Sequence, residues 1–358
     1  MTRRSYKRRK SHRRRSRKRH VERFDLHDCS KKEMRIIEAL NNPHHKKHAF
    51  EIVCIHHSKN PRAKNLFLMG GFTEGTVELE ALDDKVWMAE ILDTIDLYRT
   101  NVYIVRWDSR PLTYLVHHML TLAVTTFTFL ATLGISKHTL SSVPKFFGWL
   151  ISHYIVFMAL YFALSFKRAK KAGQLLANFL MHSNYCDVVN HASNVILLGH
   201  SLGGKIAVEC LNELYLNGYY GKKSLVSKAI LFGTAEYNHL HRAKIWKNAS
   251  KSTTHKSVNV YNTRDKILKH GLGKAAKLML IGWFKHSKNI AGVSKVLGFN
   301  NFNATREMSL PVKKRCSRYP EGSQGVCKIG NTQGHNYTAI TAWLLRQPMI
   351  RKNGVDLK

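Results

Sequence analysis

The sequence predicts an α/β fold in which helices flank a mostly parallel sheet. Short apolar runs rich in β-forming residues alternate along the chain with longer segments of helical spacing. One of these runs, residues 194–198, passes through a glycine-rich turn directly into a helical pattern. At 358 residues, the chain has room for one large α/β domain and additional segments.

Apolar runs and helical periodicity give the expected elements in chain order. We expect strands over residues 49–55, 65–69, 102–107, 195–198, 228–234 and 257–265. We expect helices over residues 29–41, 79–97, 169–181 and 205–214. Because strands and helices alternate, neighbouring strands should run parallel, and helices should cover both faces of the sheet.

The turn after residues 194–198 reads Gly199-His200-Ser201-Leu202-Gly203. This is the pattern of a nucleophile elbow, in which a serine at a sharp strand-to-helix turn exposes its hydroxyl at the carboxyl edge of the sheet. Glycine is needed two residues before and two residues after Ser201, because a side chain there would clash with the neighbouring strand or helix. The alternative is an ordinary glycine-rich turn that holds an inert serine.

A serine nucleophile needs a base, and the base needs an acid that fixes its tautomer. In α/β-hydrolases these residues occur in the order serine, acid, histidine. Asp265 is the single acid between Glu236 and Glu307, and it stands at the end of a predicted strand. We therefore expect Asp265 to be the acid. The alternative is a surface salt bridge in a basic protein.

Three histidines follow this acid in the chain. His270 is too close to Asp265 to lie on a separate loop, and His286 lies in a lysine-rich segment. His335 lies between Gly334 and Asn336, where the glycine gives a late loop freedom to turn the ring toward the site. We therefore expect His335 to be the base. A polar surface histidine is the alternative.

A second glycine-rich turn, Gly70-Gly71-Phe72, follows the strand expected at residues 65–69. A serine hydrolase needs a loop there that offers a backbone N–H to the oxyanion. The expected oxyanion hole combines the N–H of Leu202 with one from Gly71 or Phe72. In this mechanism His335 takes the proton of Ser201, which attacks an ester carbonyl, and water then releases the acyl group. The alternative is a glycine turn with no catalytic role.

Two uncharged stretches interrupt the α/β pattern. Residues 111–136 hold no formal charge, and residues 146–166 form an apolar run of about the length needed to span a bilayer. A single span would split the sheet between two compartments. We therefore expect either a transmembrane hairpin with cytoplasmic ends or a hydrophobic cap in the membrane interface. A buried helical subdomain of a soluble protein is the alternative.

The amino end is strongly basic. Residues 1–20 hold 12 Lys or Arg and no acid, in a chain of net charge +35. This composition cannot form a core, and no apolar segment follows it as in a signal peptide, so we expect a disordered arm. Three roles stay open: a nuclear-localisation or nucleic-acid-binding tail, a clamp on acidic lipid, or a solubilising extension.

The cysteines and histidines predict no metal site. The six cysteines show no metal-ligand spacing, and no HExxH motif occurs. We expect Cys54 and Cys210, which lie in apolar runs, to be core residues, and Cys316 and Cys327 to be reduced thiols. No cofactor is expected.

Several motifs occur together: Leu68-Met-Gly-Gly-Phe-Thr-Glu74, Tyr103-Ile-Val-Arg-Trp-Asp-Ser109, Gly199 to Gly203, Val260-Tyr-Asn-Thr-Arg-Asp265 and Gly334-His335. With these motifs, roughly residues 48 to 345 resemble domain-of-unknown-function family 726, a hydrolase-like group that includes transmembrane and coiled-coil domain-containing protein 4. The family usually has Trp-Glu-Ser where this chain has Trp107-Asp108-Ser109. The resemblance implies an α/β-hydrolase fold, membrane association and a serine-hydrolase triad, and it supplies no substrate.

The sequence predicts a basic arm (1–25), a first part of the hydrolase domain (26–110), a hydrophobic helical hairpin (111–166), a second part with the triad (167–350) and a tail (351–358). The predicted function is a membrane-associated serine hydrolase, a lipase or carboxylesterase that cleaves an acyl ester of a lipid, with arm and hydrolase domain on the cytoplasmic side. One alternative is an inactive hydrolase-fold scaffold that tethers membrane to nucleic acid or another acidic partner. Another is a soluble esterase with a helical cap.

Overall fold

The computed structural model describes residues 22–23, 50–71, 91–107, 121, 124, 165–182, 194–238, 242–272, 290–310, 337 and 340–358. Several expected regions lie mostly or wholly outside these residues, namely the arm, the helices at 29–41 and 79–97, and the insertion at 111–166. Within the described part of the chain, no helix is long and apolar enough to cross a membrane.

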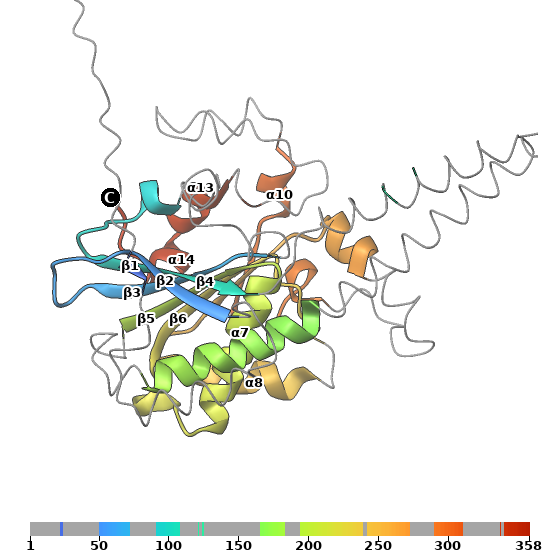
Figure 1. Cartoon of the computed structure of the whole chain (residues 1–358). Coiled ribbons are helices and arrows are strands. Elements are labelled where there is room, and N and C mark those ends of the chain that lie inside the picture. The colour runs from blue at the N-terminus through green and yellow to red at the C-terminus, as the bar shows by residue number, and fades with distance from the viewer. Residues whose placement is uncertain are drawn as a thin grey trace, which may run out of the picture.

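The described strands form one eight-stranded sheet (Figure 1). They are β1 (Glu22–Arg23), β2 (Phe50–His56), β3 (Lys64–Met69), β4 (Thr100–Trp107), β5 (Val195–His200), β6 (Val226–Phe232), β7 (Val258–Tyr261) and β8 (Asn300–Asn303). Their order is β1-β2-β4-β3-β5-β6-β7-β8. The pairs from β4 to β8 are parallel, and the pairs β1–β2 and β2–β4 are antiparallel. The α/β class and the mostly parallel sheet are thus confirmed.

The strand order reverses direction at β3. From β3 the chain moves outward to β4, then returns across β3 to β5 and continues to β6, β7 and β8. Met69, the last residue of β3, pairs with Val105 on one side and with Gly199 on the other. Ligands of open α/β sheets bind at the carboxyl ends of the strands beside such a reversal. The loops that follow β3 and β5 lie at this place.

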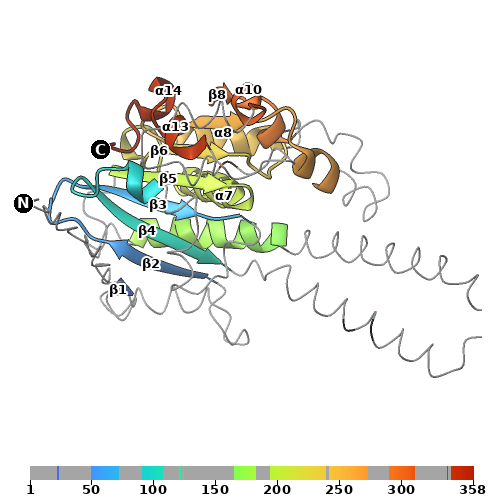
Figure 2. The same ribbon diagram turned by 90° about the horizontal axis from the view of Figure 1, so that it is seen from above.

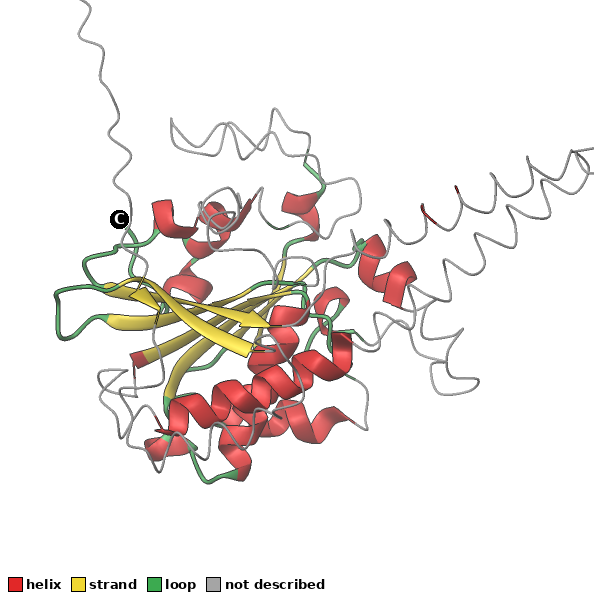
Figure 3. Ribbon diagram, viewed as in Figure 1, coloured by secondary structure: helices red, strands yellow, loops and turns green. Residues whose placement is uncertain are grey.

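Helices cover both faces of the sheet (Figures 1 and 2). One face carries the helical segment 165–182, α7 (Leu202–Leu216) and α8 (Ala243–Lys251). The other face carries α13 (Thr341–Leu345) and α14 (Pro348–Arg351). Figure 3 shows the resulting helix–sheet–helix layers. The shorter helical elements are η3 (Gly221–Lys223), η5 (Ile267–Leu272), η6 (Ala291–Val293) and α10 (Thr305–Met308).

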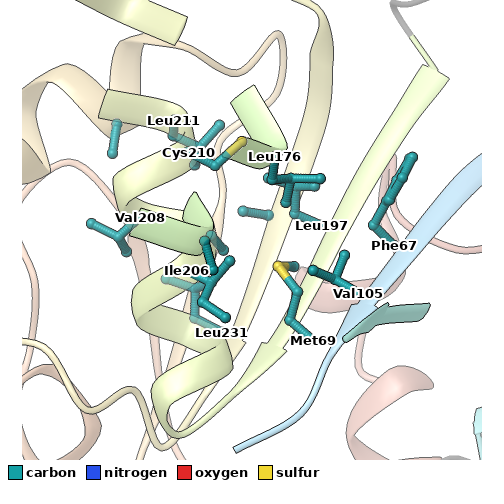
Figure 4. Packing of buried hydrophobic residues seen from close by; sticks show 14 of the residues in the cluster. Phe67, Met69, Val105, Leu176, Leu197, Ile206, Val208, Cys210, Leu211 and Leu231 are labelled. Atoms are coloured by element: carbon teal, nitrogen blue, oxygen red, sulfur yellow. The ribbon is translucent and has the colours of Figure 1, made fainter. Parts of the chain in front are cut away.

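Alternate residues of the central strands fill two separate cores. Phe67 and Met69 of β3 point into the core below α7, whereas Leu66 and Leu68 point into the opposite core. Figure 4 shows the first core, where Ile206 of α7 packs with Met69 and other sheet residues. Because both faces are buried, β3 and β5 are apolar at nearly every position. This explains the continuous apolar runs in the sequence.

The carboxyl-terminal segment packs against the chain that leads into β4. The backbone N–H of Asp96 donates to the carbonyl oxygen of Asp356 at 2.7 Å, and the N–H of Lys358 donates to that of Thr94 at 3.1 Å. The side chain of Val355 is buried in the core on this face. Residues 351–358 therefore contribute to the packed domain.

Candidate active site

Ser201 stands at the turn between β5 and α7 in a left-handed backbone conformation. Its φ and ψ are 55° and −118°, which a residue with a side chain rarely adopts. The turn is fixed from both sides, because the N–H of Ser201 donates to the carbonyl oxygen of Phe232 at 2.9 Å and its own carbonyl accepts from Ala235 at 2.9 Å. The loop after β6 therefore holds the serine in this conformation.

The two glycines of the turn leave no room for a side chain. A Cβ atom on Gly199 would lie 2.6 Å from the carbonyl oxygen of Gly203. A Cβ atom on Gly203 would overlap the Met69 carbonyl group and lie 2.7 Å from the carbonyl oxygen of Gly70. These are contacts with backbone atoms, which cannot rotate away. The glycine requirement expected from the sequence thus has a direct steric cause.

Ser201 occupies the N-cap position of α7 without acting as a cap. Its side chain makes no hydrogen bond to the first turn of the helix. An N-cap serine normally accepts such a bond, in an extended backbone conformation. The positive φ and the absent cap bond separate Ser201 from an ordinary helix-starting serine. The N–H of Leu202, the first residue of α7, has no intrahelical acceptor.

The loop after β3 begins beside this turn. The indole N–H of Trp107 donates to the carbonyl oxygen of Gly70 at 3.3 Å, and both Gly70 and Gly71 are buried. The carbonyl oxygen of Gly70 also lies close to Gly203, since a Cβ atom on Gly203 would be 2.7 Å from it. Gly71 therefore lies near the start of α7. Phe72, the other candidate for the oxyanion hole, lies outside the described residues.

Asp265 lies four residues after the end of β7, on the same edge of the sheet as Ser201. Its side chain is 0% exposed, and its Oδ1 accepts a hydrogen bond from the N–H of Leu268 at 2.9 Å. This fixes the carboxylate at the start of η5, an uncommon π-helical turn that often occurs at functional sites. Asp265 is thus a buried, oriented acid, and the alternative of a surface salt bridge is wrong.

Tyr337 joins the two parts of the site. Its ring lies 5.9 Å from the ring of His200 and stacks on Phe232 at 5.9 Å between centroids. It is also wedged against Gly233, where a Cβ atom would lie 2.6 Å from Cε2 of the tyrosine. Burial, and then the charge of Asp265, raise the pKa of Tyr337 well above its ordinary value. The tyrosine therefore packs against His200, directly before Ser201, and against the end of β6. His335, two residues earlier, is outside the described residues.

A cluster of four charges, three of them buried, begins one helical turn after Ser201. Lys205 forms ion pairs with Glu236 and, at 3.0 Å, with Glu209. Arg242 lies 2.7 Å from Glu209 and 3.1 Å from Glu236. The Nζ atom of Lys205 also lies 3.7 Å from the centre of the Phe166 ring. The cluster thus ties α7 to the loop after β6, to α8 and to the end of the second apolar run.

The charges of this cluster compensate one another. Burial alone would raise the pKa of Glu236, but attraction to Lys205 and Arg242 outweighs it and holds this pKa below its ordinary value of 4.5. Removal of one of these partners would leave a buried carboxylate without its compensating charge and would strongly destabilise the folded protein. Because the cluster lies next to the serine turn, it stabilises the helix that carries the turn.

Ser201, Asp265 and the loop at Gly71 follow β5, β7 and β3 and so lie on one edge of the sheet, whereas their action as one catalytic site stays a prediction. The sequence analysis missed further residues near the serine turn. Those residues are the charge cluster and Tyr337. The four-residue spacing of Lys205 and Glu209 was the one local signal for the cluster. Among the described residues, no group of His, Cys, Asp or Glu could hold a metal ion. Cys54 and Cys210 are buried in the core, as expected.

The fold and the site together define an α/β protein with a strained serine turn at the centre of a mostly parallel sheet. Residues 46–301 match the family described as "Protein of unknown function (DUF726)". The chain belongs to this family. The match includes Ser201 and Asp265, and the sequence resemblance to family 726 is thereby confirmed.

Two curated relatives carry membrane-protein names. An uncharacterized membrane protein of Schizosaccharomyces pombe is 30% identical over 141 residues, which is 37% of this chain and 17% of that protein. The transmembrane and coiled-coil domain-containing protein STS1 of Oryza sativa is 31% identical over 106 residues, which is 30% of this chain and 14% of that protein. Each match therefore spans less than a fifth of the relative's length.

Proposed function

We propose that this protein is a membrane-associated serine hydrolase of the α/β-hydrolase type, which cleaves an acyl ester of a lipid. The observation that carries this proposal is the conformation of Ser201, which has a φ of 55° at the end of β5. The strain is maintained by backbone hydrogen bonds and by two glycines that cannot be replaced without a clash. Strained turns of this kind persist where the surrounding structure serves a function.

The remaining triad members have the right chain order. Asp265 is a buried acid on the same sheet edge as Ser201. Two peptide units separate His335 from Tyr337, so their Cα atoms lie within about 7.6 Å of each other. Tyr337 itself packs against His200, the residue before Ser201, which supports His335 as the proposed base.

In the proposed reaction His335 takes the proton of Ser201 while the serine oxygen attacks the ester carbonyl. The N–H of Leu202 points from the start of α7, and a second N–H, from Gly71 or Phe72, would complete the oxyanion hole. His335 then gives the proton to the leaving alcohol. Water, deprotonated by the same histidine, releases the acid and restores the serine. Asp265 stabilises the imidazolium that forms in each half of the reaction.

The lipid substrate class follows from the insertion at residues 111–166. The insertion follows β4 and precedes β5 in the chain. Its second uncharged stretch ends at Phe166, which lies beside the charge cluster. The membrane-protein names of the relatives support the same assignment. An active site held at a bilayer receives insoluble esters directly, which favours a lipase or carboxylesterase over a soluble esterase.

The test is hydrolysis of a graded series of lipid acyl esters by the full-length protein in detergent micelles, measured as released fatty acid. We expect Ser201→Ala to lose at least about a thousandfold in rate, since the nucleophile is removed. Ser250→Ala is the matched control, because in the described part of the chain its hydroxyl donates to the carbonyl oxygen of Lys247 in its own helix and to no other group. Absence of hydrolysis by folded protein across the series would favour the inactive scaffold over the enzyme.

A further inference from the structure

A cavity of about 450 Å³ opens at the carboxyl ends of β7 and β8, outside the serine turn. Its volume falls within the range of about 300–1,000 Å³ that is usual for small-molecule sites. The lining consists of two cations, three neutral polar residues and one leucine, namely Arg264, Asn303, Thr305, Arg306, Ser309 and Leu310. No acidic side chain is among the described residues that line it. The composition suits an anion.

The two arginines are the groups available to a ligand. Both side chains are exposed, and neither guanidinium has a hydrogen-bond or ion-pair partner in the part of the chain that the structure describes. The hydroxyls are already used: Thr305 Oγ1 accepts from the N–H of Thr263 at 2.8 Å, and Ser309 Oγ donates to the carbonyl of Thr305 at 2.7 Å. Two free guanidiniums match the planar, paired hydrogen bonding of a phosphate.

The cavity is placed to serve the same substrate as the serine turn. Arg264 immediately precedes Asp265, so one turn holds the buried acid on its inner side and a cavity cation on its outer side. β7 and β8 lie two and three strands from β5, which corresponds to about 10–15 Å across the sheet. That distance separates the reacting ester carbonyl of a lipid from a phosphate at the far end of its headgroup.

We propose that this cavity binds a phosphomonoester on the headgroup of the lipid substrate, so that the preferred substrates are acyl esters of lipids whose headgroup ends in a phosphomonoester. The assignment of the bound phosphate to a substrate rests on the proposed hydrolase function. The cavity itself does not depend on catalysis, and its binding is measured separately.

Binding is tested with full-length Ser201→Ala protein in detergent, which cannot consume the ligand. The probes are a short-chain phosphatidylinositol monophosphate, the same lipid without the added phosphate, and inorganic phosphate. We expect the phosphorylated lipid to bind at least about tenfold more tightly than the other two, since paired charge-assisted bonds are formed. Adding Arg264→Gln and Arg306→Gln should remove this difference.

The matched control replaces Arg62 and Arg351, which are exposed on other parts of the molecule, by glutamine. This variant loses the same charge and should keep the preference. Equal affinity for both lipids, or equal loss in both double variants, would overturn the proposal. Inorganic phosphate binding as tightly as the phosphorylated lipid would also overturn it, because the cavity would then recognise a free anion.

Turnover separates this proposal from the proposed function. With Ser201 restored, the ratio of kcat/KM for phosphatidylinositol monophosphate over phosphatidylinositol should fall about tenfold in the Arg264→Gln/Arg306→Gln variant. If the lipid binds through the two arginines but no variant releases fatty acid, the hydrolase function fails while the phosphate site stands.

Discussion

Gly203 packs so closely against Met69 that a Cβ atom on residue 203 would lie 2.5 Å from the Met69 carbonyl carbon. This contact joins the first turn of α7 to the end of β3, and it fixes the serine turn beside the loop that begins at Gly70. Both partners of the contact are backbone, so neither can move without moving a strand or a helix. The position of Ser201 thus depends on the absence of one methyl group.

Gly203→Ala should therefore unfold the turn or push α7 away from β3. Overpacking of this kind costs about 1–3 kcal/mol, and more where backbone is the obstacle. Gly218→Ala is the comparison, because a Cβ there meets nothing within 4 Å and only its φ of +86° is unfavourable. Thermal unfolding in detergent should show a much larger loss for Gly203→Ala. Equal losses in the two variants would show that the close contact does not exist in solution.

Removal of the Tyr337 hydroxyl group should not destabilise the folded protein. Its Oη atom is buried and has no hydrogen-bond partner within the described structure. Because an unsatisfied buried hydroxyl is unfavourable, Tyr337→Phe should leave the free energy of unfolding unchanged or raise it by up to about 1 kcal/mol. Tyr337→Ala should lower it by about 3–5 kcal/mol through loss of packing against Phe232 and Gly233. Destabilisation by Tyr337→Phe would mean that the hydroxyl has a partner.

The buried Lys228 should make the free energy of unfolding depend on pH. Its buried Nζ atom donates to the carbonyl oxygens of Met349, Ile350 and Lys352 at 2.9, 2.9 and 2.7 Å, at the end of α14. Burial, and then the charge of Lys64, lower the pKa of Lys228 from 10.5 to about 8. Between these two pH values the unfolded chain binds this proton more tightly than the folded chain does. The contribution of Lys228 to stability should therefore rise with pH from about 8 to 10.5.

The comparison of Lys228→Met with Lys247→Met isolates this contribution, since Lys247 is exposed on α8. Denaturant unfolding between pH 7 and 11 should show a shallower rise for Lys228→Met than for the control. The same slope in both variants would show that Lys228 keeps an ordinary pKa in the folded protein.

The serine turn could be predicted from the sequence because it follows a local steric rule. The serine turn needs glycines at fixed spacing from Ser201, and the structure shows why at Gly199 and Gly203. Asp265 was chosen as the acid because it stands alone among basic and neutral residues after a predicted strand, and the structure shows that its side chain is buried. Its catalytic role stays a prediction. Both predictions needed only the residues of one short segment of the sequence.

Other features depend on pairs far apart in the chain. Glu236 and Lys205 are separated by 31 residues, and their pairing appears only when β6 lies beside β5. β8 was not predicted because its sequence, Asn-Asn-Phe-Asn, has low strand propensity and is held by pairing with β7. The helices α8, α13 and α14 were missed because, at 9, 5 and 4 residues, they are too short for helical periodicity to be recognised.

The central claim is that Ser201 is an activated nucleophile. The most direct test is labelling of the folded, detergent-solubilised protein with a fluorescent fluorophosphonate, beside Ser201→Ala and His335→Ala. We predict that the native protein is labelled and that both variants are not. Labelling that persists in Ser201→Ala, or a folded native protein that stays unlabelled, would contradict it.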